Sequence, residues 1–294
     1  MRSTHGAAPT AGRLAGLGAA LLLTFTAACS SPDTGGQDGD IGPTKSGSTK
    51  SGTAVRKPVP GAAFDYQLGG PYTPPDQVRA VSRDRTADPV PGLYNICYVN
   101  AFQAQPGDAV TWWQDHHPDL LLLRADDGHL VIDEDWTEPL LDISTPARRD
   151  ALMDIVGPWI DGCADAGYDA VEPDNLDSYE RSDDLLDVAD AVAFATLLAD
   201  RAHEQGLAIA QKNTTDLLPH RARVGFDFAV VEECARYDEC GDFADAYRGR
   251  VFDIEYVKAD FATACRTWGE DLSITLRDLD VEPAGTKGHV YRRC

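Results

Sequence analysis

The chain is poor in positive charge and in the residue patterns that hold metals. Its 294 residues include 26 Lys and Arg against 48 Asp and Glu, which gives a formal net charge of −22. A surface of this sign repels nucleic acid and attracts cations, so we expect no nucleic-acid partner. The chain has no CxxC pair, and His116 and His117 are adjacent rather than one helical turn apart, which argues against a zinc site.

An apolar run at the N-terminus is too short for a comfortable membrane span. Arg2 and Arg13 precede the segment LAGLGAALLLTFTAA, and Cys29 follows it directly. A basic start, an apolar centre and small residues at the end are typical of a secretory signal, here residues 1–28. The small residues before Cys29 favour a lipoprotein signal, in which lipidated Cys29 anchors the protein to the outer face of the cell membrane. Secretion without a lipid is the alternative.

The folded part of the chain is predicted to begin at residue 62. Residues 29–61 are mainly Gly, Ser, Thr, Pro and Lys, and they have too little apolar content to fold, which predicts a flexible linker. Residues 62–294 are long enough for one large domain and carry 20 Lys and Arg against 45 Asp and Glu, a net charge of −25. We expect this domain to be a monomer.

Six cysteines remain when Cys29 is set aside. An even number in an exported protein suggests three disulfides, although six cysteines allow 15 pairings. The pairs that we favour are Cys234–Cys240, Cys265–Cys294 and Cys97–Cys163. The first would close a short local loop, the second would tie the last helix to the C-terminus, and the third is what remains. Free buried thiols are the alternative.

Short apolar or β-branched runs predict eight strands. They cover residues 64–68, 93–99, 139–143, 168–174, 207–213, 226–233, 251–256 and 272–276. Several are apolar on both faces, as buried parallel strands are. Helical patterns lie between the strands, and one of them starts at a predicted Ser182 cap. The segment 120–136 predicts a hairpin that turns at Asp127 and Gly128.

The alternation of strands and helices predicts a single-domain α/β fold, the (β/α)8 TIM barrel. A doubly wound open sheet is the alternative, but no glycine-rich phosphate loop follows the first predicted strand. The active site of such a barrel lies at the carboxyl ends of its strands.

Acids, amides and aromatic residues occupy the predicted strand ends. They are Gln67, Tyr98, Asn100, Asp142, Glu172, Asp174, Asn175, Lys212, Asn213, Glu232, Glu233, Glu255, Tyr256, Arg277 and Asp278. Sugar sites have this composition, because hydroxyl groups need polar partners and sugar rings stack on aromatic rings. In the segment VEPDN, Glu172 and Asp174 share one face of a strand, so both can point into the barrel mouth. Two carboxylates across a cleft are the usual equipment for hydrolysing a glycosidic bond.

Seven segments occur together in the order found in a known family. They are FDYQLGG, ICYVNAF, LLDIS, GYDAVEPDNLDSY, LAIAQKN, FDFAVVEECARYDEC and FDIEY. The set resembles the endo-α-1,4-polygalactosaminidases of glycoside hydrolase family 114 over nearly all of residues 62–294. The resemblance implies a TIM barrel, no metal or other cofactor, and hydrolysis of α-1,4-linked galactosamine in exopolysaccharide. It places the catalytic pair on Asp174 and Glu232. Val231 and Glu233 stand where the family commonly has Asn and Gln, which leaves another amino sugar open as the substrate.

Further residues are candidates for contact with the substrate. They are Gln67, Tyr98, Asp142, Glu172, Asp177, Tyr179, Lys212, Asn213 and Glu255. Glu172 could instead pair with Lys212, and Glu255 is the main rival of Glu232. Trp112 and Trp113 could form a platform for a sugar, or one of them could face the core.

The acidic domain would attract a cationic galactosamine polymer, which is the partner that we expect. A non-catalytic glycan-binding surface lipoprotein is the alternative function.

Overall fold

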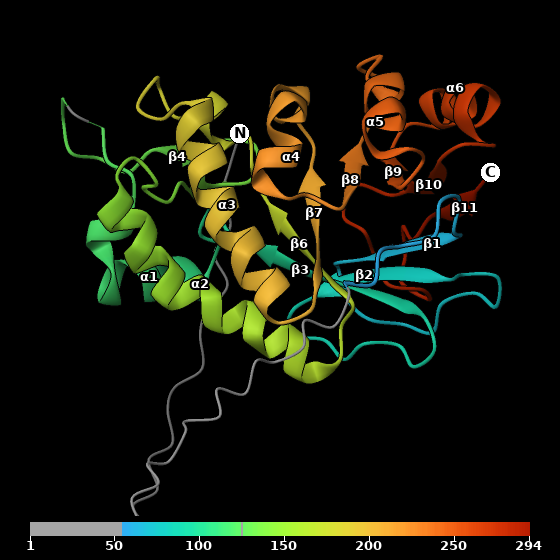
Figure 1. Ribbon diagram of the computed structural model, residues 1–294, viewed down its shortest axis with the longest axis horizontal. Helices are drawn as coiled ribbons and strands as arrows, with labels where there is room; N and C mark the ends of the chain where they lie inside the picture. Colours follow the sequence, from blue (N-terminus) through green and yellow to red (C-terminus); the bar gives the residue numbers. More distant parts are fainter. Residues whose placement is uncertain (1–54, 125) are drawn as a thin grey trace, which may run out of the picture. The chain divides into compact units, whose positions relative to one another are not determined.

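Eight parallel strands form a nearly closed barrel in the computed structural model, which describes residues 55–124 and 126–294. The predicted signal segment, Cys29 and most of the predicted linker lie outside the described residues. The barrel strands are β1 (Phe64–Gln67), β2 (Ala80–Asp84), β3 (Tyr94–Asn100), β6 (Ala170–Asp174), β7 (Ala208–Lys212), β8 (Phe228–Glu232), β9 (Val251–Glu255) and β10 (Ser273–Arg277). Each pairs in parallel with the next in this order (Figure 1). The predicted α/β barrel is confirmed.

The barrel closes where β10 meets β1. The short strand β11 (Tyr291–Arg293) runs antiparallel to β10. From these two strands, the Thr275 and Tyr291 hydroxyl groups donate hydrogen bonds to the Phe64 carbonyl oxygen, at 3.0 and 3.1 Å. Side chains and one added strand therefore bridge the gap between the first and last barrel strands.

Alternation along the strands separates two cores. Even-numbered residues from β1 to β9, such as Phe64, Ile96 and Phe228, form one buried cluster inside the barrel. Odd-numbered residues, such as Val171 and Ile209, belong to a second cluster between the strands and the helices. On each strand, the next inward-facing residue after those of the interior cluster is therefore the one that reaches the mouth of the barrel.

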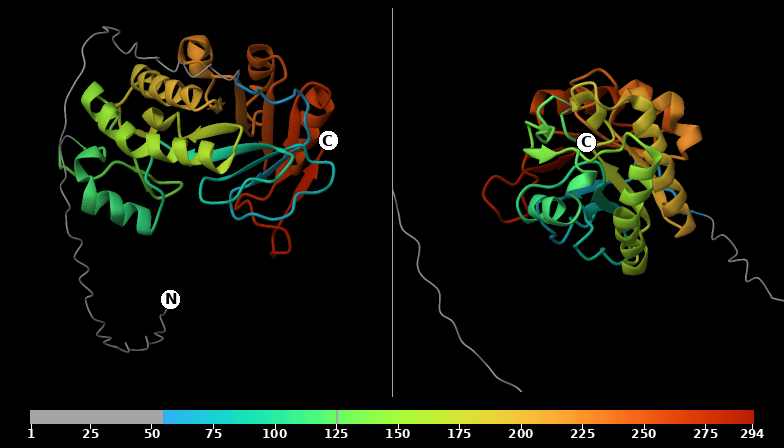
Figure 2. Two further views of the ribbon diagram at one scale, coloured as in Figure 1. Left: turned by 60° about the horizontal axis from the view of Figure 1, so that its bottom comes forward. Right: turned by 90° about the vertical axis from the view of Figure 1, so that its left-hand side faces the viewer.

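The helices lie outside the strands (Figures 1 and 2). They are α1 (Asp108–His116), α2 (Pro146–Ala166), α3 (Val188–Glu204), α4 (Arg221–Val224), α5 (Cys240–Tyr247) and α6 (Lys258–Trp268), with 3-10 turns η1 (Pro118–Leu120), η2 (Ser178–Arg181) and η3 (Thr215–His220). α2 begins after Thr145, whose side chain caps it, and ends before Gly167, which has the left-handed conformation.

The predicted start of α3 at Ser182 is wrong. The helix begins at Val188, because the Asp187 carboxylate accepts hydrogen bonds from the backbone of Ala189 and Asp190, and Asp190 bonds back to Asp187 in a capping box. The Ser182 hydroxyl group instead accepts a hydrogen bond from Leu186 within the preceding turn.

The third predicted strand, 139–143, is not a barrel strand. Glu138–Pro139 forms the two-residue strand β5, which pairs with β4 (Ile132–Asp133) in a separate small sheet. Leu140 and Leu141 are nevertheless buried, so this apolar run indicated burial rather than a place in the barrel. The missing barrel strand is β2, whose sequence AVSRD has apolar residues only at its start. Loops rather than helices connect β1 to β2 and β2 to β3 (Figure 1).

The predicted hairpin and all three predicted disulfides are present. Leu123 pairs antiparallel with Leu130, and Gly128 has the positive φ of 70° that the turn between them needs. The disulfides join Cys97 to Cys163, Cys234 to Cys240 and Cys265 to Cys294. Disulfides of this kind are typical of exported proteins.

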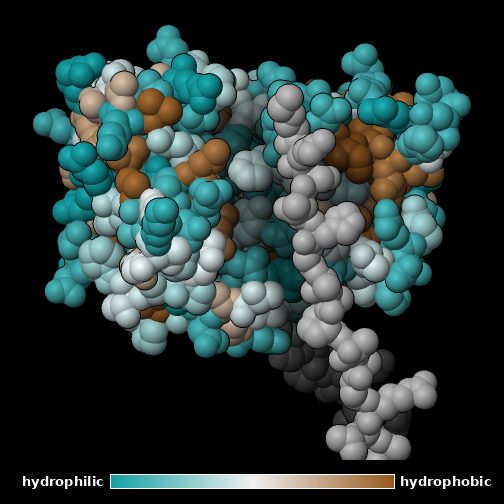
Figure 3. All heavy atoms as spheres, turned by 180° about the vertical axis from the view of Figure 1, so that it is seen from behind, coloured by the Kyte–Doolittle hydropathy of each residue, from teal (hydrophilic) through white to brown (hydrophobic). Residues whose placement is uncertain are grey.

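The face of the protein seen in Figure 3 is mostly hydrophilic, with hydrophobic residues in a few groups. This agrees with the charge of −25 on residues 62–294. In the part of the chain that the structure describes, none of the helices has the length and apolar character needed to span a bilayer.

Candidate active site

A cavity of about 410 Å³ opens at the carboxyl ends of the barrel strands. Its lining is acidic and aromatic. It consists of Tyr66, Leu68, Gly69, Tyr98, Asp133, Asp135, Trp136, Glu138, Asp174, Asn175, Asp177, Arg181, Lys212, Asn213, Glu232, Tyr256, Leu279, Asp280 and Val281. This is the site where a barrel of this kind performs its chemistry.

Lys212, the last residue of β7, joins three acids from the two neighbouring strands β6 and β8. Its side chain is 1% exposed. The ammonium nitrogen lies 3.1 Å from Glu172 Oε1, 3.0 Å from Asp174 Oδ1, 3.3 Å from Glu232 Oε2 and 3.0 Å from the Tyr66 hydroxyl group. Burial lowers the pKa of Lys212, but the three carboxylates outweigh burial and raise it well above its usual value. Lys212 is therefore a fixed cation that holds Asp174 and Glu232 on either side of it.

Asp174 ends β6 and is held as an anion. The Tyr98 hydroxyl group donates a hydrogen bond of 2.7 Å to Asp174 Oδ2. Burial alone would raise the pKa of Asp174, but attraction to Lys212 and the hydrogen bond from Tyr98 outweigh it and leave the pKa below its usual value. Asp174 is thus held as an anion whose side chain is partly exposed to the cavity.

Glu232 ends β8 and is held by groups from the strands on both sides. The Tyr256 hydroxyl group, just after β9, donates a hydrogen bond to Glu232 Oε1. Asn213, just after β7, accepts a hydrogen bond of 2.9 Å from the Glu232 backbone nitrogen. Burial and the charge of Glu232 raise the pKa of Tyr256 well above its usual value, so the phenol stays a donor. The Glu232 carboxylate is therefore oriented toward the cavity, where its side chain is 27% exposed.

The chain bends sharply just after three of these strands. Asn175, Asn213 and Glu233 follow β6, β7 and β8 and have φ values of 68°, 47° and 58°. Positive φ is uncommon for residues other than glycine and is concentrated at functional sites. The strands end at these positions, directly after Asp174, Lys212 and Glu232.

One wall of the cavity carries additional acids. Arg181 contacts Asp133 at 2.7 Å and Asp177 at 2.9 Å. Glu138 accepts a hydrogen bond of 2.8 Å from Asn100, yet burial raises its pKa to about 7, and the charge of Asp174 adds to this effect. The ring of Trp136, in the same segment, is 56% exposed. The wall thus offers negative charge beside an aromatic surface.

Six of the eleven residues predicted for the site line the cavity. They are Tyr98, Asp174, Asp177, Lys212, Asn213 and Glu232. Glu172 lies beneath the cavity, 0% exposed, and pairs with Lys212, so the second of its two predicted roles is the one that the structure shows. Its other oxygen accepts a hydrogen bond of 2.6 Å from Ser82.

Four other predicted residues lie away from the cavity. Gln67 is buried and braces the strand ends, with hydrogen bonds to Asp65 and Arg83. Asp142 caps the turn before α2 by accepting from Ser144 and pairs with Arg148 at 2.7 Å. The Tyr179 hydroxyl group lies near Thr214, Glu180 and Asp216 outside the lining.

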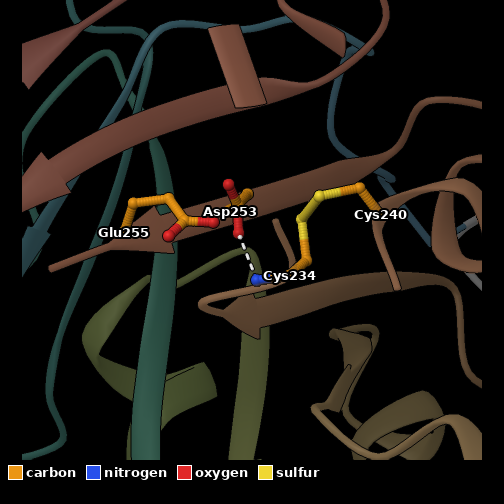
Figure 4. Close-up of side chains that lie close together, drawn as sticks. All are labelled: Cys234, Cys240, Asp253 and Glu255. Atoms are coloured by element: carbon orange, nitrogen blue, oxygen red, sulfur yellow. Dashed lines mark hydrogen bonds between the residues drawn. A yellow bond between two sulfur atoms is a disulfide. The ribbon is translucent and has the colours of Figure 1, made fainter. Parts of the chain in front are cut away.

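The fourth is Glu255, which lies on the outer face of β9. Its carboxylate accepts a hydrogen bond of 2.8 Å from the Ala235 backbone, and Asp253 accepts one from Cys234 (Figure 4). Both acids are fully buried beside the Cys234–Cys240 disulfide, whose sulfur atoms lack the thiolate charge that binds metals. Burial raises the pKa of Glu255 to about 7 and that of Asp253 well above its usual value. We interpret these acids as braces of the loop that follows Glu232, and Glu255 does not line the cavity.

Several cavity residues were not predicted. Tyr66 could have been found, because it shares the inward face of β1 with Phe64, whereas Tyr256 was among the predicted strand-end residues but not among the expected substrate contacts. Trp136 and Glu138 had no such signal, since they follow the hairpin and reach the cavity through the irregular segment around β5.

Comparisons with known proteins agree with this geometry. The model of the family described as Glycoside-hydrolase family GH114 matches residues 45–294. Among solved structures, Ega3 from Aspergillus fumigatus, crystallised in complex with galactosamine, has a TM-score of 0.65 and 23% identity over 82% of this chain and 98% of its own. The glycoside hydrolase domain of PelA from Pseudomonas aeruginosa has a TM-score of 0.56 and 18% identity over 78% of this chain and 98% of its own. No curated protein matches the chain in sequence.

Proposed function

The chain belongs to glycoside-hydrolase family GH114, and from this premise we propose that it cleaves α-1,4-galactosaminidic bonds within galactosamine-rich exopolysaccharide, with Asp174 and Glu232 as its catalytic pair. One observation carries the proposal. Two partly exposed carboxylates from β6 and β8 lie on either side of the Lys212 ammonium group in the cavity at the barrel mouth. Most glycoside hydrolases use two carboxyl groups that flank the scissile bond in this way.

In the proposed reaction Asp174 is the nucleophile and Glu232 the general acid and base. Asp174 attacks the anomeric carbon while Glu232 gives its proton to the departing glycosidic oxygen, which leaves a glycosyl ester on Asp174. Glu232 then takes a proton from water, the water oxygen attacks the same carbon, and Asp174 is released. The lowered pKa of Asp174 supports its role as the anion, because Lys212 and Tyr98 stabilise its charge.

The acidic wall supports an amino sugar as the substrate. Galactosamine units without acetyl groups carry ammonium charges near neutral pH, and Asp135 and Glu138 offer carboxylates on the same wall as the exposed Trp136 ring. A sugar can stack on that ring while its ammonium group pairs with the acids. The net charge of −25 on residues 62–294 would attract the polymer from a distance.

We further propose export with lipidation at Cys29, so that hydrolysis takes place outside the cell.

Replacing each catalytic carboxyl group by its amide tests the proposal. We expect Asp174→Asn and Glu232→Gln to fold normally and to release reducing ends from α-1,4-galactosamine polymer at least about 10³-fold more slowly than the wild type. Asp142→Asn removes a carboxylate outside the cavity and is the matched control, with activity close to that of the wild type. Normal activity in both amide variants would refute the assignment. Binding of the polymer by the wild type without reducing-end release would favour a non-catalytic glycan-binding protein.

A further inference from the structure

A second cavity, of about 440 Å³, lies on the other side of the wall that bounds the active site. Its lining combines indole rings with amides and charged groups. It consists of Asp84, Arg85, Asn100, Gln103, Gln105, Asp108, Ala109, Trp112, Trp113 and Trp159. Three of the five tryptophans in the chain are thus in one cavity that the proposed reaction does not use.

The three indole rings form a connected group between α1 and α2. Trp113 is buried and meets Trp112 edge-on with ring centres 5.2 Å apart, and Trp159 edge-on at 6.2 Å. One face of the Trp112 ring stacks on His116, with ring centres 5.2 Å apart, and Trp112 is 38% exposed, so a ligand would meet the part of the ring that His116 leaves open. The Arg85 guanidinium group lies 4.3 Å from the centre of the Trp159 ring, which holds this cation against the edge of the cavity. Trp113 therefore supports Trp112 from behind, while Trp112 faces the solvent.

A buried amide in the lining has unused hydrogen-bonding capacity. Gln103 is 1% exposed, and its Oε1 atom has no hydrogen-bond partner among the described residues. Its Nε2 atom donates to Asp133, so the unpaired atom is the acceptor, an enclosed atom that a hydroxyl or ammonium donor would satisfy if the side chain turned toward the cavity. The two carboxylates of the lining, Asp84 and Asp108, outnumber its one cation, Arg85. The free groups therefore favour a ligand that is a hydrogen-bond donor and positively charged.

From these observations we propose that the second cavity binds an amino-sugar unit of the same polymer without cleaving it. The inference rests on the proposed function for the identity of the polymer. An amino sugar has an apolar ring face for Trp112, hydroxyl groups for Gln103 and Gln105, and an ammonium group for Asp108.

The two cavities share a thin polar wall. Asn100 lines the second cavity and donates to Glu138 of the first, and Gln103 donates in the same way to Asp133. A polymer chain held in the second cavity would be kept near the catalytic acids without occupying their cavity. The second site should therefore assist with long substrates and should have no effect on substrates too short to reach it.

The test separates binding from hydrolysis. Galactosamine oligosaccharides are titrated calorimetrically into the Asp174→Asn variant. The titration is repeated with two double variants, in which Asp174→Asn is combined with Trp112→Ala or with Asp108→Asn. We expect two classes of site in the parent variant, and loss of one class, or weakening by about tenfold, with either addition. Tyr237→Ala removes an exposed aromatic ring that lines neither cavity, and it should leave both classes intact. Circular dichroism verifies that each variant is folded.

In the active protein, Trp112→Ala and Asp108→Asn should raise KM for long polymer about tenfold and leave cleavage of short oligosaccharides unchanged. Unchanged oligosaccharide binding and unchanged polymer KM in both variants would overturn the second site. If the proposed function were wrong, the result would differ. Neither the wild type nor Trp112→Ala would then release reducing ends from any galactosamine substrate.

Discussion

Lys212 and Glu172 form an ion pair of 3.1 Å in which both side chains are almost fully buried, at 1% and 0% exposure. Glu172 does not reach the cavity, so its contribution is to the position and charge of Lys212. Lys212 in turn contacts both proposed catalytic carboxylates. The buried pair of Glu172 and Lys212 beneath the cavity therefore determines where Asp174 and Glu232 lie.

We predict that Lys212→Met will destabilise the protein by about 3–5 kcal/mol, because it leaves Glu172 buried without its partner. Adding Glu172→Gln should recover a large part of this loss, since the orphan charge is then removed. Urea unfolding of the two single variants and the double variant measures the coupling. Purely additive effects of the two substitutions would contradict the pairing. Activity should be lost in every variant that lacks Lys212.

Tyr256→Phe is expected to lower kcat by about 10- to 100-fold while the protein stays folded. The lost hydrogen bond orients the Glu232 carboxyl group, and removing one partner of such a bond costs about 1–3 kcal/mol. Tyr98→Phe, which frees Asp174, should have a similar effect. Tyr94→Phe is the control, because its hydroxyl group donates to the Arg56 carbonyl oxygen away from the cavity, and its kcat should not change. If Tyr256→Phe were as active as this control, Tyr256 would have no part in orienting Glu232.

The reaction should retain the anomeric configuration. The Asp174 and Glu232 oxygens nearest Lys212 lie 3.0 and 3.3 Å from one nitrogen atom, so they are no more than about 6.3 Å apart, below the lower limit for inverting enzymes of about 6.5 Å. Proton NMR of fresh hydrolysate should show the α-anomer first, followed by mutarotation. Initial release of the β-anomer would require a water-filled gap between the two acids and would exclude Asp174 as the nucleophile.

Stability should fall as the pH rises toward 7, in part because of Glu255. Burial raises its pKa from 4.5 to about 7, and nearby Asp260 and Glu233 act in the same direction against Arg236. Between these pH values the folded protein holds a proton that the unfolded chain has lost, so this contribution is complete below about pH 4.5 and disappears as the pH passes about 7.

Glu255→Gln imitates the protonated state and should flatten this dependence. We expect the wild type to lose on the order of 2–3 kcal/mol from this group between pH 4.5 and pH 8, and the variant to lose less over the same range. Thermal melts at both pH values measure the difference, and Asp142→Asn is the control carboxylate. Parallel pH profiles of Glu255→Gln and the wild type would show that Glu255 is ionised in the folded protein.

Much of the fold follows from local patterns. Seven of the eight barrel strands were predicted, because runs that are buried on both faces have few polar residues to obscure them. β2 was missed because its second half, Ser82 to Asp84, is polar and no helix precedes or follows it. The segment 139–143 was predicted as a strand in its place, because a buried segment outside the barrel and a buried barrel strand both have a short apolar run.

The sequence by itself determined that acids and aromatic residues gather at the strand ends, because a strand leaves the apolar core at a definite residue. Only the tertiary structure decided which of them share a cavity. Successive side chains along a strand point to opposite faces, so Glu255 and Tyr256 cannot both point inward. Which of the two does so is known only once the strand is placed in the barrel. Glu172 and Asp174 share a face, and their different depths along the barrel axis put one beneath Lys212 and the other in the cavity. Such positions depend on the packing of all eight strands, which no single segment encodes.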